Sequence, residues 1–235
     1  MSKKQTDLNA VKEMAVSFLY LPIEETEYSP IVVQHPIFES AHNISQTDNE
    51  ISVVNLLEDD KALSETRSRI KQQINECDTL FGVYAIIRKS YRLTFLKYIM
   101  PYLSKKDMSE LLADAWVSSE NPNGDANVSL KTLISWFKKA DKTALMTKED
   151  YAIYAALPDI FKVYRGVSIG RNEKGLSYTR SLETAQWFAN RFNRDGLHGY
   201  VQEAEIKKEN ALAYFNTRGE DEIVVDTFSI TIHRM

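Results

Sequence analysis

Three short stretches near the C-terminal end carry side chains whose types and spacing could do chemistry. They read VYRGVS (163–168), GLSYTRS (175–181) and NTRGEDEIVVD (216–226), and the candidate residues in them are Arg165, Gly166, Ser177, Thr179, Glu220 and Glu222. The planar, permanently charged fork of an arginine suits phosphate oxygens, and a carboxylate at a fixed strand end can stabilise a developing cation. The three stretches therefore combine side-chain types that can bind and catalyse, each joined to a strand-like segment.

Each of these residues also has an ordinary structural interpretation. Arg165 could end a strand in a salt bridge, Ser177 and Thr179 are common strand residues, and acidic pairs such as Glu220 and Glu222 are usually solvated. The order of the residues, their spacing and the helix pattern TAQWFANRF (184–192) between them carry more information than any single residue.

The elements that must position these residues are short strands and one helix. FKVYRG (161–166) alternates, so Phe161, Val163 and Arg165 are expected on one side of a strand. Ser181 is placed to cap a helix, and we expect its buried face to consist of Ala185, Phe188, Ala189 and Phe192. Further strands are expected at GLSYT (175–179), GYVQEAEI (199–206), ALAYF (211–215), EIVVD (222–226) and TFSITIH (227–233), the last with Phe228, Ile230 and Ile232 on one face.

The part before these strands reads as mostly helical. Apolar residues recur at helical spacing in one stripe made of Met108, Leu111, Leu112, Ala115 and Trp116, and again after an expected N-cap at Ser129. Residues 62–77 and 79–100 predict further helices, whereas PIVVQHPIF (30–38) reads as extended and ESAHNISQTDNE (39–50) as a long polar loop. We interpret the aromatic residues of this part as core packing.

The composition changes at about the same place. All six prolines lie at or before Pro158, and six of the eight glycines lie at or after Gly166. The sequence therefore predicts an α+β protein, with a mainly helical region at 1–156 and a small, mostly antiparallel, sandwich-like β-rich domain at 157–235.

Charge and composition narrow the partners. The 235 residues carry a net charge of −4, which gives no general reason to bind nucleic acid or an anionic membrane, so neither is expected as a partner. No apolar run approaches the roughly 18 residues that a membrane span needs, and the first residues lack an apolar signal segment, so we expect a cytoplasmic protein. One cysteine and four scattered histidines have no ligand spacing, and no metal site is expected.

The three stretches together resemble a known family. An arginine in a first strand, Ser-x-Thr in a second strand that leads into a helix, and Glu-x-Glu at the head of a later strand are similar to the Arg-Ser-Glu pattern of mono-ADP-ribosyltransferases, which include toxin-type and bacteriophage-encoded members. The resemblance covers about residues 160–235. It departs from the family in two places: the usual Ser-Thr-Ser run is spread out here as SYTRS (177–181), and Asp221 between the two glutamates could be an inserted acid that disturbs the loop.

The resemblance implies a transferase that uses NAD as a substrate. Cleaving the nicotinamide glycosidic bond develops positive charge on the ribose, so a site must hold the ribose, restrain the diphosphate and place negative charge near the cation. By resemblance, Glu222 would stabilise that cation and Ser177 would steady Glu222, with Thr179 supporting the strand. Arg165 would serve the diphosphate and ribose, and the backbone of Gly166 would hold the nicotinamide carboxamide.

Glu220 has a separate expected role. It lies two residues before Glu222, so in a regular strand both would project to the same face. The resemblance implies that such a first glutamate engages the acceptor in arginine-modifying members, with NTRGED (216–221) as the loop that presents the target.

Three kinds of function remain open at this point. The first is a mono-ADP-ribosyltransferase that modifies a host protein, in the host cytoplasm if the chain is phage-encoded. The second is an NAD glycohydrolase, in which water is the acceptor. The third is a non-catalytic inhibitor or binding protein with the same fold, which the joint presence of Arg165, Ser177 and Glu222 disfavours.

Overall fold

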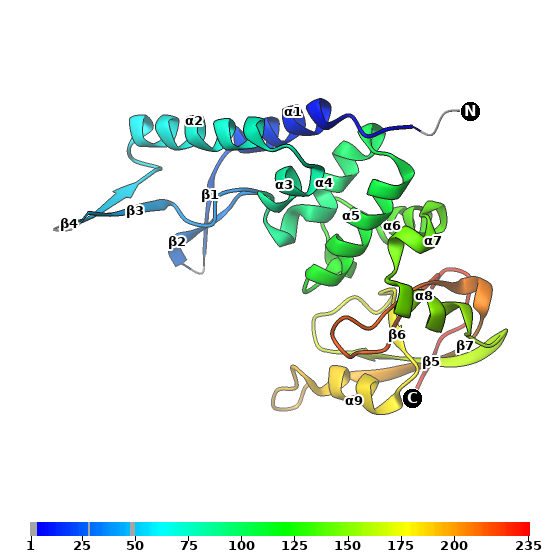
Figure 1. The fold of residues 1–235 in the computed structure, drawn as a ribbon. Coiled ribbons are helices and arrows are strands. Elements are labelled where there is room, and N and C mark those ends of the chain that lie inside the picture. Colours follow the sequence, from blue (N-terminus) through cyan, green and yellow to red (C-terminus); the bar gives the residue numbers. More distant parts are fainter. Residues whose placement is uncertain (1–3, 28, 48–49) are drawn as a thin grey trace. The chain divides into compact units, whose positions relative to one another are not determined.

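The computed structural model describes residues 4–27, 29–47 and 50–235, and it divides into two compact units, Met1–Leu103 and Ser104–Met235 (Figure 1). The change from helices to strands that the composition predicts near residue 156 falls inside the second unit, between Ala155 at the end of one helix and Ile160 at the start of a strand. All six candidate residues belong to the second unit, so the chemistry of the three stretches depends on that unit.

Four α-helices and two 3₁₀ turns build most of the described part of the first unit. The helix α1 carries Val11, Ala15 and Leu19 at helical spacing on one face, and this buried face packs against α2, α3 and α4. The bounds are α1 Leu8–Leu19, α2 Asp60–Glu76, α3 Leu80–Ala85, η1 Lys89–Tyr91, α4 Arg92–Ile99 and η2 Met100–Tyr102.

The first unit also contains two antiparallel hairpins. One pairs β1 (Glu24–Thr26) with β2 (Ser29–Gln34), and the other pairs β3 (His42–Thr47) with β4 (Glu50–Asn55). The predicted long loop at 39–50 is therefore wrong over β3, and its residues 48–49 lie outside the described residues. The polar sequence of β3 does not predict a strand. The segment is extended because its backbone pairs with β4, whose sequence EISVVN has a higher β-propensity.

His35 is a buried titratable group next to the first hairpin. Its Nδ1 accepts hydrogen bonds from the backbone N–H groups of Ile37 and Phe38, both at 3.0 Å, so the ring is held with Nδ1 unprotonated. Burial, together with the positive charges of Arg67 and Arg88, lowers the pKa of His35 from 6.5 to about 4. The folded state of this unit therefore favours a neutral imidazole.

We expect this group to make stability depend on pH. Between pH 6.5 and 4, His35 is mostly protonated in the unfolded chain and mostly neutral in the folded protein. The free energy of unfolding therefore falls as the pH is lowered through this window, by on the order of 2 kcal/mol. Urea unfolding at a series of pH values checks this. In His35→Asn, which keeps an acceptor near the Nδ1 position, the slope in this window should be shallower, and an equal slope in both proteins would contradict the assignment.

The second unit begins with helices, and the sequence predicts two of them, α5 and α6. The expected stripe from Met108 to Trp116 is buried along α5, and the Ser129 hydroxyl caps α6 by accepting the N–H of Thr132 at 3.2 Å. The bounds are α5 Lys105–Ser118, η3 Pro122–Gly124, α6 Leu130–Lys139, α7 Lys142–Leu145, α8 Lys148–Ala155, α9 Leu182–Asn190 and η4 Lys208–Asn210.

A six-stranded sheet forms the rest of the second unit, and every neighbouring pair in it is antiparallel. Its order is β10-β7-β5-β6-β9-β8, with bounds β5 Ile160–Val167, β6 Ser177–Thr179, β7 Tyr200–Lys207, β8 Ala211–Phe215, β9 Glu222–Val225 and β10 His233–Arg234. The strands belong to one hydrogen-bonded sheet rather than to two facing sheets. Its two halves are joined by a single residue pair, Tyr164 with Thr179, so β5 and β6 diverge on either side of it.

The predicted strand TFSITIH (227–233) is wrong except at its last residue. Asp226 ends β9 by a turn, because its carboxylate accepts the N–H of Phe228 at 3.2 Å and the hydroxyl of Ser229 at 2.9 Å. Phe228 is consequently exposed, and the alternating apolar pattern does not face a core. Only the short β10 follows, paired with β7.

The helix α9 is where the sequence predicts it, but its buried face is different. Ser181 caps it by accepting the N–H of Thr184 at 3.1 Å, and its buried residues are Ala185 and Ala189, not Phe188 or Phe192. The reason is the close approach of α9 to β5: a Cβ on Gly166 would lie only 2.1 Å from the carbonyl oxygen of Ala185. At that separation only small residues fit between helix and strand.

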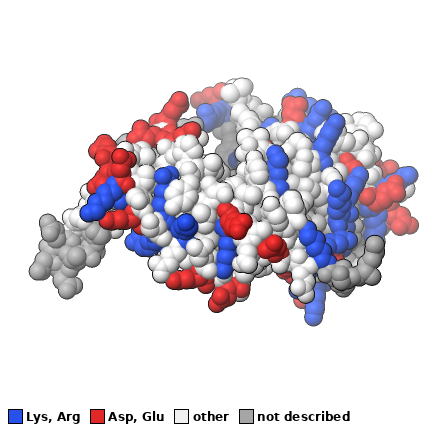
Figure 2. All heavy atoms as spheres, turned by 90° about the horizontal axis from the view of Figure 1, so that it is seen from above, with Lys and Arg blue, Asp and Glu red and all other residues white. Residues whose placement is uncertain are grey.

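No helix in the described part of the chain is both long enough and apolar enough to cross a membrane. On the face shown in Figure 2, acidic and basic side chains are interspersed among uncharged ones.

Candidate active site

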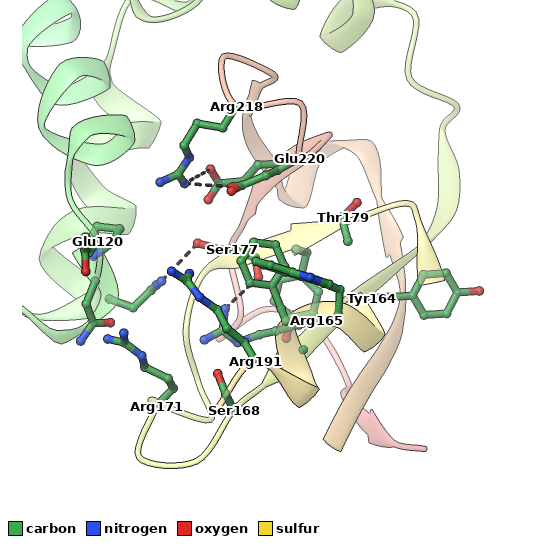
Figure 3. A pocket seen from close by; sticks show the side chains of 18 of the residues that line it. Glu120, Tyr164, Arg165, Ser168, Arg171, Ser177, Thr179, Arg191, Arg218 and Glu220 are labelled. Carbon is green, nitrogen blue, oxygen red and sulfur yellow. Dashed lines mark hydrogen bonds and ion pairs between the residues drawn. The ribbon is translucent and has the colours of Figure 1, made fainter. Parts of the chain in front are cut away.

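The candidate residues come together in one cavity of the second unit. The cavity has a volume of about 350 Å³, within the size range of small-molecule sites, and all six of the residues singled out in the sequence line it. Arg165 and Gly166 come from β5, Ser177 and Thr179 from β6, Glu222 from the start of β9 and Glu220 from the preceding loop. Figure 3 labels four of these six, Arg165, Ser177, Thr179 and Glu220; the ring of the neighbouring Tyr164 points away from the others.

Glu222 is the most enclosed acid of the cavity. It lies opposite Thr179 of β6 and Phe215 of β8 in the sheet, and only 7% of its surface is exposed. Its Oε1 accepts a hydrogen bond of 3.0 Å from the indole N–H of Trp116 in α5, and the Ser177 hydroxyl also donates to this carboxylate. Burial raises the pKa of Glu222, and the donors Ser177 and Trp116 act against that rise.

Ser177 is itself held in place by the segment that follows α5. The Asn123 side chain donates to Ser177 Oγ at 3.1 Å through Nδ2 and accepts the backbone N–H of Leu176 at 2.6 Å through Oδ1. With its lone pair engaged by Asn123, the Ser177 hydroxyl has its proton available for Glu222. Asn123, Ser177 and Glu222 therefore form a chain of hydrogen bonds that sets the direction of the carboxylate.

Glu220 reaches the cavity, but not by the expected route. It lies before β9 rather than in it, and Asp221 between the two glutamates has a φ of +49°, which breaks the strand alternation that would put both on one face. Gly219, with a φ of +70°, turns the loop just before it. Asp221 is anchored by Asn216, whose Oδ1 accepts its N–H at 3.1 Å, and the loop thereby brings Glu220 back to the same cavity.

Arg218 lies between the two glutamates. Its Nη2 is 3.0 Å from Oε2 of Glu220 and 3.8 Å from Oε2 of Glu222. The first distance is that of a charge-assisted hydrogen bond, and the second is longer than a hydrogen bond. Figure 3 shows this side chain directed toward Glu220. The guanidinium is thus held mainly by Glu220, with Glu222 as a looser neighbour.

Arg165 closes the gap where β5 and β6 diverge. Its Nη1 donates to the carbonyl oxygen of Ser177 at 2.8 Å and its Nη2 to that of Asn172 at 2.9 Å, while Nε makes no hydrogen bond with any described residue. Burial lowers the pKa of Arg165, and nearby Tyr178 and Glu222 oppose that effect, so the guanidinium stays charged. A Cβ on Gly175 would lie 2.2 Å from Nη2, so the loop packs directly on the guanidinium.

Gly166 and Thr179 have clear structural partners as well as a place in the cavity wall. Only glycine fits at position 166, because α9 packs directly against it. The Thr179 hydroxyl accepts the N–H of Ser181 at 3.1 Å. Thr179 therefore holds the turn from β6 into α9, in addition to lying opposite Glu222.

The cavity wall also includes Arg171, Arg191, Trp187 and Phe192, which the sequence pattern did not assign to the site. The guanidinium of Arg171 lies 5.4 Å from the centre of the Phe192 ring, and that of Arg191 lies 5.1 Å from the same ring. Trp187, 58% exposed, lies 5.5 Å from the guanidinium of Arg191. Neither arginine forms an ion pair with a carboxylate in the described ranges, although Glu120 also lines the cavity; this part of the wall therefore presents two arginines beside aromatic rings.

The sequence pattern also did not assign Trp116 or Asn123 to the site. Trp116 has the spacing of a core residue and is fully buried against Phe137, with ring centres 5.2 Å apart. A buried indole N–H needs an acceptor, which is the only signal in the sequence that such a residue does more than pack. Its acceptor is 106 positions away, at Glu222, and spacing along the chain does not reveal it.

Comparison with protein-family models, with curated proteins and with solved structures finds no match for this chain. The class of protein must therefore be argued from the geometry of the cavity.

Proposed function

We propose that this protein is a mono-ADP-ribosyltransferase that cleaves NAD and transfers ADP-ribose to an arginine of a protein target. The observation that carries the proposal is that Arg165, Ser177 and Glu222 line one cavity, although 57 positions separate the first from the last (222 − 165). Within this cavity the acid is buried, directed by two hydrogen bonds, and accompanied by a second carboxylate. These are the requirements of a site that stabilises a cation beside an acceptor.

Glu222 is the group that would act on the breaking bond. When the bond between ribose C1′ and the nicotinamide nitrogen breaks, its electron pair leaves with nicotinamide and positive charge develops on the ribose. A carboxylate in a buried site stabilises that charge more than it would in water, provided that it is ionised and already in position. The N–H of Trp116 and the hydroxyl of Ser177 support both conditions.

The diphosphate of the substrate is assigned to Arg171 and Arg191. The guanidinium of Arg165 is already bound to two carbonyl groups, so its part in the site is to hold the Ser177 strand against β5. Arg171 and Arg191 border the cavity beside the exposed ring of Trp187, which offers a flat apolar surface for the adenine. The backbone beside Gly166 remains the proposed contact for the nicotinamide carboxamide.

The acceptor side is assigned to Glu220. A guanidinium nitrogen must be held close to C1′ and must give up a proton as the new bond forms, and a carboxylate at this place can do both. Arg218 shows that the loop accommodates a guanidinium against Glu220, at 3.0 Å. We propose a protein of the host cell as the target, if the chain is encoded by a phage.

The test is to incubate the purified chain with labelled NAD and a cell extract, and to measure free nicotinamide and protein label in parallel. Release of nicotinamide with label on a discrete protein band supports transfer. Release without protein label would show an NAD glycohydrolase instead, and neither release nor label would leave a non-catalytic binding protein.

Loss of the indole N–H should change the pH dependence of the reaction. In Trp116→Phe the ionised form of Glu222 loses a donor, so the pKa of Glu222 rises further, and the acid limb of nicotinamide release should move to higher pH by about half a unit to one unit. A pH-rate profile measures this. The control is Trp136→Phe in α6, which removes an indole of similar burial that makes no hydrogen bond with Glu222. A profile of Trp116→Phe that is lower but not displaced would mean that Trp116 only packs.

A further inference from the structure

The loop before β9 holds one of the chain's own arginines where an acceptor would have to lie. Arg218 contacts Glu220, the acid assigned to the acceptor, at 3.0 Å, and the same nitrogen atom, Nη2, is 3.8 Å from Glu222. Because Nη2 is too far from Glu222 for a hydrogen bond, that carboxylate can still accept one from a ligand hydroxyl. One nitrogen is therefore held by the acceptor acid and lies 3.8 Å from the acid that acts on the breaking bond. Figure 3 shows the Arg218 side chain directed toward Glu220.

A second arginine near the same loop provides a comparison within the chain. Arg180 pairs with Asp221 at 3.4 Å through Nε, and its side chain is 43% exposed, the same fraction as that of Arg218. Arg180 is outside the wall of the cavity, whereas Arg218 is part of it. The two arginines thus differ in their position relative to the acids of the site and not in their access to solvent.

We infer that Arg218 is a site of self-modification, at which the protein attaches ADP-ribose to its own guanidinium in an intramolecular reaction. This inference rests on the proposed function. Nη2 of Arg218 forms the new bond to ribose C1′, the bond from C1′ to the nicotinamide nitrogen breaks, and nicotinamide leaves with the electron pair. The Nη2 proton passes to Glu220 and from there to water, and the substituted guanidinium keeps its positive charge.

Self-modification has a consequence for the site. An ADP-ribosyl group on Arg218 would occupy the cavity that binds the next NAD and would remove the guanidinium from Glu220. The modified protein should therefore turn over more slowly than the fresh protein. Arg218 would act as an internal acceptor that competes with the target and limits the activity.

The experiment uses the full chain alone with NAD, and follows the intact mass and free nicotinamide together. We expect a mass increase of one ADP-ribose unit, with fragmentation of the modified peptide placing it on Arg218. In Arg218→Lys, which keeps the charge but not the guanidinium fork, this label should fall by about 10-fold or more. The matched control Arg180→Lys should be labelled like the original protein. The labelled fraction at a given time should not change when the protein is diluted, because the reaction is intramolecular.

The possible failures are distinct. Nicotinamide release with no label, or with label at a residue other than Arg218, overturns self-modification at this site and leaves cleavage of NAD standing. Labelling of Arg218 that slows in proportion to dilution would show that one copy modifies another, and would overturn the intramolecular geometry. If no nicotinamide is released at all, the proposed function fails and the inference falls with it.

Discussion

Replacing Glu222 by glutamine should lower nicotinamide release from NAD by about 10²-fold or more, because the amide keeps the shape of the side chain but removes the charge that stabilises the cation. Transfer to protein and hydrolysis by water should be lost together, since both pass through the same broken bond. The free energy of unfolding should change little, because burial already opposes ionisation of Glu222 in the folded protein. Release assays and thermal melts of both proteins provide the measurement.

Glu220→Gln is the companion variant, because it alters the acid of the acceptor side in the same cavity. It should impair transfer to protein and leave slow hydrolysis of NAD largely intact, since water needs less activation than a guanidinium. Equal loss of both activities in the two variants would mean that the roles of the glutamates are misassigned. Unchanged release in Glu222→Gln would place the site elsewhere.

Replacing Arg165 by lysine should destabilise the second unit by about 2–4 kcal/mol, because two charge-assisted hydrogen bonds to backbone carbonyl groups cannot both be made by one ammonium group in the same place. Only 8% of the Arg165 surface is exposed, so water can replace few of the lost hydrogen bonds. Denaturant unfolding measures the loss, and nicotinamide release should fall as well, because the Ser177 strand is no longer held against β5.

Arg171→Lys is the control for that prediction. It changes a second arginine of the cavity wall whose described contact is with the Phe192 ring, so its effect on unfolding should stay within about 1 kcal/mol, while its affinity for NAD should weaken. If Arg165→Lys were as stable as the original protein and lost only NAD affinity, Arg165 would be the ligand of the diphosphate that the resemblance implies, and our assignment to Arg171 and Arg191 would be wrong.

Local sequence signals determined the elements that carry the candidate residues. Alternation placed β5, β7 and β8, helical spacing placed the buried stripe of α5, and Ser129 and Ser181 were correctly identified as helix caps. These signals succeed because they depend on neighbours within a few positions along the chain. They failed at β3 and at 227–232, where backbone pairing with another strand and a turn made by Asp226 outweighed the local pattern.

The tertiary structure alone decided which side chains meet. The buried face of α9 follows from the missing Cβ of Gly166 on a different element, which left Phe192 and Arg191 for the cavity wall. Likewise, Trp116 and Asn123 act on Glu222 and Ser177 over 106 and 54 positions, and the arginine between the two glutamates reaches its place through the positive φ angles of Gly219 and Asp221. The order of residues along a chain does not show such contacts, because a hydrogen bond or a close packing distance depends on three-dimensional position. The sheet that sets those positions forms only when strands distant in sequence pair with one another.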